Sequence, residues 1–155
     1  MNFRNDVPGY GFQLKKGATA LTESWPALEE VSNNHLMLGH IMEWFYTGLG
    51  GIKQADNSVA FRNIIIRPEI VGDLTWVKSS YQSPYGKIRS DWKKVGKSLE
   101  MKVEIPANST ATIFFPTRQE SSVTENGKKI VVSKSEDGKY FCKVGSGSYI
   151  FQMGL

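Results

Sequence analysis

One helix with apolar side chains around most of its circumference lies in the N-terminal third of this chain. We expect it to start at Asn33 or Asn34, with Ser32 or Asn33 as its cap, and to end at the glycine-rich run Gly48–Gly51. Its apolar positions are Leu36, Met37, Leu38, Ile41, Met42, Trp44, Phe45 and Leu49. Such a helix is typical of the interior of a large protein. We therefore expect it to fold onto the rest of the chain, to pack against a second copy, or to be disordered.

The chain after residue 60 has a different pattern. Apolar and polar residues alternate with period two, and turn signals recur about every ten residues, which is typical of an antiparallel β-sandwich. Asn126-Gly127 and Asp137-Gly138 predict two-residue hairpins, and Ser83–Gly86 predicts a tight turn. The expected strands are Phe61–Arg67, Gly72–Gln82, Gly86–Lys94, Ser98–Ile105, Ser109–Phe115, Val123–Glu125, Lys129–Ser133, Tyr140–Val144 and Gly147–Gln152.

The two patterns predict a mainly β protein of two parts. Residues 1–52 form a helical part, residues 60–155 form the sandwich domain, and the polar segment Lys53–Ser58 reads as a linker. The length of 155 residues suits one ordinary domain, or one small domain with an appendage.

Composition excludes several classes of function. The net charge of +4 is mild and the basic residues are scattered, so we expect no nucleic-acid partner. No apolar run approaches the roughly 20 residues that a membrane-spanning helix needs, so we expect no membrane partner. The single cysteine, Cys142, excludes an internal disulfide and a cysteine metal site, and we read it as a small residue of a strand. We expect no metal and no cofactor.

The segment Gly17–Tyr46 contains the residues that are most able to carry chemistry. Glu23 lies between Thr22 and Ser24 and two residues before Trp25, so an extended backbone would place the carboxylate and the indole on one face. The simpler interpretation is a solvated loop glutamate. His35 falls at the helix start, where it is either a capping or packing histidine or a hydrogen-bond donor to a substrate hydroxyl.

Aromatic residues in the strands allow two interpretations. The first is that they fill the sandwich core, which needs several large side chains. The second is that some are exposed and stack on sugars. Exposure of Trp76, Trp92 and Tyr85 distinguishes the two, because a coplanar exposed pair would favour binding. The aromatics concerned are Trp76, Tyr81, Tyr85, Trp92, Phe114 and Phe115.

Three stretches together resemble the C-terminal end of bacterial α-L-rhamnosidases of glycoside hydrolase family 78. They are GATALTESW, SNNHLMLGHIMEWFYTGLGGI and FRNIIIRPEIVGDLTWVKSSYQSPYGKIRSDWK, and the resemblance covers nearly the whole chain. It implies a C-terminal β-sandwich preceded by a helical remnant of an (α/α)6 barrel catalytic domain. It also implies hydrolysis of terminal α-linked L-rhamnose with inversion, by an acid and a base.

The resemblance assigns roles to three residues. Glu23 matches the catalytic general base, Trp25 a wall of the rhamnose pocket, and His35 the histidine that hydrogen-bonds the sugar. The connection from Trp25 to Ser32 is shorter than in many members, so the pocket rim differs. We expect the general acid and most barrel helices to lie upstream of Met1.

These implications predict a glycosidase fragment that is inactive by itself. Its partners would be a rhamnose-containing glycoside or polysaccharide and, through the apolar helix, a second copy of the chain. The alternative is a non-catalytic carbohydrate-binding or structural β-sandwich module. The sequence leaves the compartment of the parent protein open between the cytoplasm and the periplasm or exterior.

Overall fold

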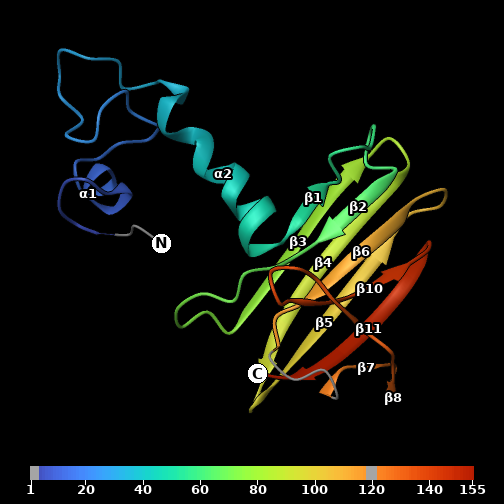
Figure 1. Ribbon diagram of the computed structural model, residues 1–155. Helices are drawn as coiled ribbons and strands as arrows, with labels where there is room; N and C mark the ends of the chain where they lie inside the picture. The colour runs from blue at the N-terminus through green and yellow to red at the C-terminus, as the bar shows by residue number, and fades with distance from the viewer. Residues whose placement is uncertain (1–3, 118–121) are drawn as a thin grey trace. The chain divides into compact units, whose positions relative to one another are not determined.

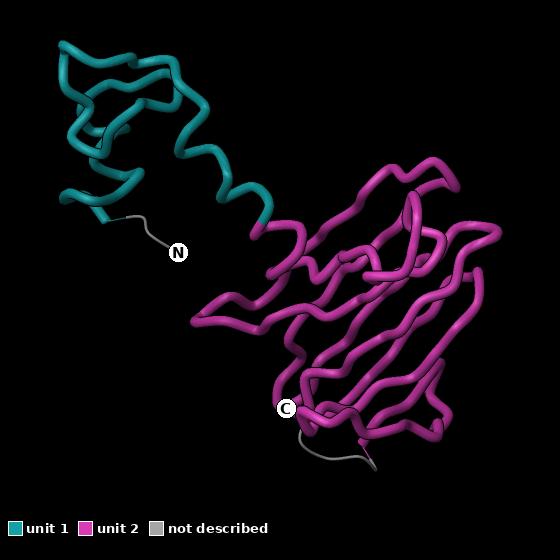
Figure 2. The backbone as a smooth tube through the Cα atoms, turned by 45° about the horizontal axis from the view of Figure 1, so that its top comes forward, with its two compact units in different colours: residues 1–43 teal, residues 44–155 magenta. Residues whose placement is uncertain are grey.

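The protein consists of two compact units, Met1–Glu43 and Trp44–Leu155 (Figure 2). The computed structural model describes residues 4–117 and 122–155. In this described part, no helix is long and apolar enough to cross a membrane.

The first unit contains little regular structure. A short helix, α1 (Tyr10–Lys15), is followed by a long connection to the 3₁₀ helix η1 (Leu36–His40). The helix then continues as α2 (Ile41–Trp44) and as the π-helical segment η2 (Phe45–Leu49), so it crosses the boundary between the units (Figure 1). The expected helix therefore exists, but it is irregular along its length.

The prediction that Ser32 or Asn33 caps this helix is wrong, and the interpretation of His35 as a capping histidine is confirmed. His35 caps it, because its ring nitrogen Nδ1 accepts a hydrogen bond of 3.0 Å from the N–H of Met37. The hydroxyl of Ser32 instead accepts a hydrogen bond of 3.3 Å from the N–H of Asn34, and the Asn33 amide donates to loop carbonyls. The predicted end is confirmed: η2 stops at Leu49, and the chain turns at the glycines that follow.

The second unit is a β-sandwich, which confirms the mainly β prediction (Figure 1). A five-stranded sheet has the order β1-β2-β6-β10-β9, and a six-stranded sheet has the order β3-β4-β5-β11-β7-β8. All paired strands are antiparallel except β2 and β6, which run parallel. The strands are β1 (Ile52–Gln54), β2 (Asn63–Ile66), β3 (Trp76–Ser83), β4 (Gly86–Val95), β5 (Ser98–Ile105), β6 (Thr110–Phe115), β7 (Thr124–Glu125), β8 (Lys128–Lys129), β9 (Ser133–Lys134), β10 (Tyr140–Val144) and β11 (Gly147–Gly154).

Local predictions succeeded unevenly. The Asn126-Gly127 hairpin is confirmed: Glu125 pairs with Lys128, and both turn residues have positive φ. Asp137-Gly138 instead lies in a five-residue connection, since Lys134 pairs with Tyr140. The predicted linker after residue 52 is partly wrong, because Ile52–Gln54 pairs with β2 as an edge strand. The expected strand Lys129–Ser133 is replaced by the short strands β8 and β9.

The inner faces of the two sheets form the core. Phe115 from the five-stranded sheet meets Phe151 from the six-stranded sheet at a ring-centroid distance of 5.1 Å. Trp92 is also buried there, which agrees with the core interpretation, whereas Trp76 and Tyr85 are exposed. Buried isoleucines, leucines, valines and methionines of both sheets complete the core.

The end of the helix is attached to this sandwich. The indole Nε1–H of Trp92 donates a buried hydrogen bond of 2.9 Å to the carbonyl of Leu49. The N–H of Glu69 donates to the carbonyl of Gly48, and the N–H of Arg67 donates to that of Gly51. Since the last carbonyls of a helix lack partners within the helix, the sandwich supplies them here.

Candidate functional site

The candidate site is a loop of the first unit that is closed by hydrogen bonds between its two ends. The N–H of His35 donates to the carbonyl of Leu21 at 2.7 Å, and the N–H of Glu23 donates to the carbonyl of Ser32 at 2.9 Å. These bonds bring the two sequence-predicted residues Glu23 and His35 to the base of the same loop.

Glu23 is oriented by the opposite side of this loop. Its carboxylate oxygen Oε2 accepts a hydrogen bond of 3.0 Å from the N–H of Ser32, so Glu23 and Ser32 are joined twice. Glu23 is half-buried. The other oxygen, Oε1, has no hydrogen bond to any residue in the described ranges 4–117 and 122–155. The site thus holds a fixed carboxylate with one oxygen available to a ligand.

The backbone beside Glu23 differs from the predicted conformation. The chain bends at Glu23 and turns at Ser24–Ala27, where the N–H of Ala27 donates to the carbonyl of Ser24. An extended segment is therefore not what places Glu23 and Trp25. The turn is held by the carbonyl of Ser24, which also accepts from Thr22 Oγ1 at 2.7 Å and from Gln13 Nε2 at 3.3 Å.

Trp25 packs against α1. Its ring meets Tyr10 edge to face, with centroids 5.0 Å apart and planes at 75°. The Tyr10 hydroxyl donates to the carbonyl of Leu38 at 2.5 Å, and burial raises the pKa of Tyr10 above its ordinary value. Tyr10 therefore connects Trp25 to the start of the helix, and it fixes one edge of the indole.

His35 has a defined tautomer as a result of its capping bond. A backbone N–H can only donate, so Nδ1 of His35 must be the acceptor in its contact with Met37. In the neutral ring the proton then lies on Nε2, which becomes a hydrogen-bond donor. The side chain is exposed, so the capping role leaves this donor available.

Sequence reasoning missed the residues that support the site. Gln13 and Thr22 are buried polar residues, and Ser32 is the partner of the candidate base. Gln13 and Ser32 act across nine or more residues of sequence, so no local pattern could identify them. Within residues 4–117 and 122–155, no group of three or more His, Cys, Asp or Glu side chains could hold a metal ion.

Comparison with known proteins identifies the family. Residues 51–129 match the model of the bacterial α-L-rhamnosidase C-terminal domain, and residues 1–49 match that of the bacterial α-L-rhamnosidase six-hairpin glycosidase domain. This chain belongs to the bacterial α-L-rhamnosidase family. The change from one model to the other falls at the point where the helix ends and β1 begins.

Individual relatives of this rhamnosidase chain agree. An α-L-rhamnosidase of Streptomyces avermitilis is 28% identical over 93% of this chain, and one of Formosa agariphila is 31% identical over 79%. The structure of α-L-rhamnosidase from Dictyoglumus thermophilum superposes with a TM-score of 0.88, at 28% identity over the whole chain. The Streptomyces avermitilis enzyme in complex with L-rhamnose superposes with a TM-score of 0.85, at 25% identity over 97% of this chain.

The matched part of each relative is small. This rhamnosidase chain spans 14% and 13% of the length of the two sequence relatives, and 18% and 15% of the two solved structures. It therefore corresponds to one region of these enzymes, which contains the C-terminal domain and a piece matching the glycosidase domain.

Proposed function

We propose that this chain is part of an enzyme that removes terminal α-linked L-rhamnose with inversion. In that protein residues 1–52 would belong to the catalytic barrel, and residues 60–155 would form the C-terminal sandwich. The observation that carries the proposal is that the chain matches both α-L-rhamnosidase family models in succession. The Streptomyces avermitilis relative in complex with L-rhamnose supports rhamnose as the sugar.

Glu23 is the proposed general base. An inverting glycosidase needs a carboxylate that activates water, about 6.5–9.5 Å from the carboxyl group that protonates the leaving oxygen. The bond from the Ser32 N–H fixes Oε2 of Glu23, and Oε1 is then the atom that would take the proton of the water. Orientation of the base in this way supports general-base catalysis, which depends on geometry first.

Trp25 and His35 are the proposed sugar contacts. The Nε2–H of His35 would donate to a rhamnose hydroxyl, since its Nδ1 is occupied by the N–H of Met37. Trp25 would form a wall of the pocket, with Tyr10 holding its edge. Both side chains come from the ends of the hydrogen-bonded loop that also carries Glu23, which supports a common site.

The 155-residue chain by itself should be inactive. A base without its matching acid in a closed pocket gives little stabilisation of the transition state. The purified chain is therefore expected to release no L-rhamnose from an aryl α-L-rhamnoside above the buffer background. Release at a rate that is lost on Glu23→Gln would contradict this expectation.

A chimera tests the role of Glu23 directly. In it, this chain replaces the matching region of the Streptomyces avermitilis enzyme, and aryl α-L-rhamnoside hydrolysis is measured. Glu23→Gln should lower kcat by about 10²–10⁴-fold, the usual contribution of general acid–base catalysis. Glu30→Gln, an exposed glutamate of the same loop, is the matched control and should leave kcat unchanged. Equal kcat for both variants would remove Glu23 from the mechanism.

A second proposal concerns the apolar helix. Leu36, Met37 and Met42 are exposed in the single chain, with 83%, 58% and 52% of their surfaces accessible. Apolar side chains this exposed on one short helical segment mark a surface that a partner can cover. We propose that in solution the isolated chain buries these side chains against a second copy.

A further inference from the structure

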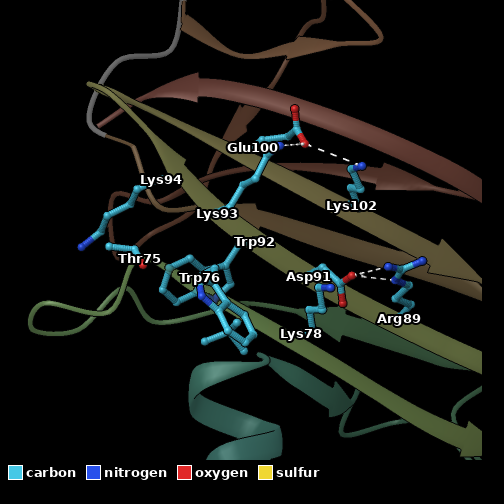
Figure 3. A pocket seen from close by; sticks show the side chains of 11 residues that line it. Thr75, Trp76, Lys78, Arg89, Asp91, Trp92, Lys93, Lys94, Glu100 and Lys102 are labelled. Carbon is cyan, nitrogen blue, oxygen red and sulfur yellow. Dashed lines mark hydrogen bonds and ion pairs between the residues drawn. The ribbon is translucent and has the colours of Figure 1, made fainter.

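The outer face of the six-stranded sheet carries a groove whose side chains the rhamnosidase chemistry does not use. The strand register places Trp76, Lys93 and Glu100 in one row across β3, β4 and β5. Lys78, Asp91 and Lys102 form the next row, which Figure 3 shows beside the first. The groove has a volume of about 580 Å³.

The charges in this groove are organised and mainly positive. Five cationic side chains line it, against the two carboxylates Asp91 and Glu100. Asp91 is nearly buried; it binds Arg89 and accepts a hydrogen bond of 3.3 Å from the N–H of Ser79. Glu100 is contacted by Lys93 at 3.2 Å and by Lys102 at 3.8 Å (Figure 3). Arg89, Lys93 and Lys102 are therefore ion-paired within the groove.

Trp76 gives the groove an exposed aromatic surface. The indole is 61% exposed, whereas Trp92, the tryptophan of the neighbouring strand β4, is buried. The ammonium group of Lys78 lies 6.0 Å from the centre of this ring. An exposed tryptophan beside a cation is suited to a ligand with both an apolar face and a negative charge.

The fixed carboxylates favour a saccharide over a polyphosphate. Asp91 and Glu100 lie within the groove, where their negative charge disfavours the closely spaced phosphates of a nucleic acid. A sugar acid offers what the groove can bind: a ring face for Trp76 and a carboxylate for Lys78.

We propose that this groove binds an acidic polysaccharide that contains uronic acid residues. Trp76 stacks on a sugar ring, and Lys78 pairs with the uronate carboxylate. The groove lies on the sandwich, and binding there needs no hydrolysis. The proposal is therefore independent of the catalytic role proposed for Glu23, and either can fail without the other.

The test measures binding of the full 155-residue chain by isothermal titration calorimetry. The ligands are polygalacturonate, the same polymer with its carboxyl groups methyl-esterified, and a neutral galactan. We expect binding to polygalacturonate that weakens at least about tenfold on esterification, since the charge is removed. Absence of binding to polygalacturonate, or equal binding of all three polymers, would overturn the proposal.

Variants locate the binding. Trp76→Ala and Lys78→Ala should each weaken binding about tenfold or more, as loss of a central contact does. Lys128→Ala is the matched control, because it removes the same charge from the exposed strand β8 outside the groove. Equal weakening by Lys78→Ala and Lys128→Ala would show that net charge alone attracts the polymer and would refute binding in the groove. Trp76→Phe keeps an aromatic face and should restore most of the affinity.

Discussion

Gly51 is the position where a single methyl group should damage this protein most. It follows the helix and precedes β1, with φ of +69°, a conformation that residues with a Cβ rarely adopt. An added Cβ would lie 2.2 Å from the nitrogen of Pro68 and 2.3 Å from the carbonyl carbon of Arg67. Both are backbone atoms and cannot rotate away, so Gly51→Ala must force the two segments apart.

The expected cost of Gly51→Ala follows from two parts. The left-handed conformation costs an alanine about 1–2 kcal/mol. Separation of the segments also breaks the hydrogen bond of 2.8 Å from the N–H of Arg67 to the carbonyl of Gly51, which leaves buried groups unpaired at about 1–3 kcal/mol. The sum is about 2–5 kcal/mol, a large share of the 5–15 kcal/mol that stabilises an ordinary domain.

Gly96→Ala is the control that isolates the close approach. Gly96 has φ of +61° in the β4–β5 turn, but no atom lies within 4 Å of the position that an alanine methyl group would take there. Its cost should be the conformational part alone, about 1–2 kcal/mol. Urea unfolding followed by far-ultraviolet circular dichroism, which reports the strands, gives both free energies. If Gly51→Ala costs no more than Gly96→Ala, the argument from close approach is wrong.

Two further predictions follow from buried and exposed groups. Burial, with a smaller effect of the Glu125 charge, raises the pKa of Cys142 to about 11. At pH 8 its thiol should therefore react slowly with a thiol reagent in the folded chain and rapidly in urea. Equal rates in the two states would contradict the burial of this thiol. Light scattering should find that the isolated chain is a dimer and that the double variant Leu36→Glu, Met37→Glu is a monomer. Val131→Glu, at another highly exposed apolar position, should remain a dimer. A monomeric unmutated chain would exclude a second copy as the partner that covers the helix.

Strands were predictable where the sequence pattern that forms them lies within a few residues. β5 and β10 have the predicted bounds, since alternation of side chains and flanking turn residues both lie within a few positions. β1 could not be predicted, because Ile52 is its one large apolar residue and the strand exists only through its pairing with Ile66. The five-residue connection at Asp137 is closed by local hydrogen bonds, in which Ser135 bonds Asp137 and Lys139, and the two-residue turn rule does not foresee this arrangement.

The roles of the candidate site residues stay a prediction, and their structural support could not be predicted from the sequence. Family resemblance singled out Glu23, Trp25 and His35, and the structure places all three on one closed loop and the helix start that follows it. The bond from the N–H of Ser32 to Glu23 could not be predicted, because it joins residues nine positions apart in the sequence. This unpredicted contact therefore explains the orientation of the carboxylate, whereas the cap depends on the His35 ring.

Trp92 shows what the sandwich does for the glycosidase region. The sequence left it open between core packing and sugar stacking, and its burial decides for the core. Its indole nevertheless has a specific partner, the carbonyl of Leu49, which ends the segment that matches the glycosidase domain. A helix end with buried, unpaired carbonyls is unstable, so the C-terminal domain stabilises the last turn of that segment through a side chain from its own core. The two family regions are thus joined by hydrogen bonds, and a flexible linker between them would leave the last helix carbonyls unpaired.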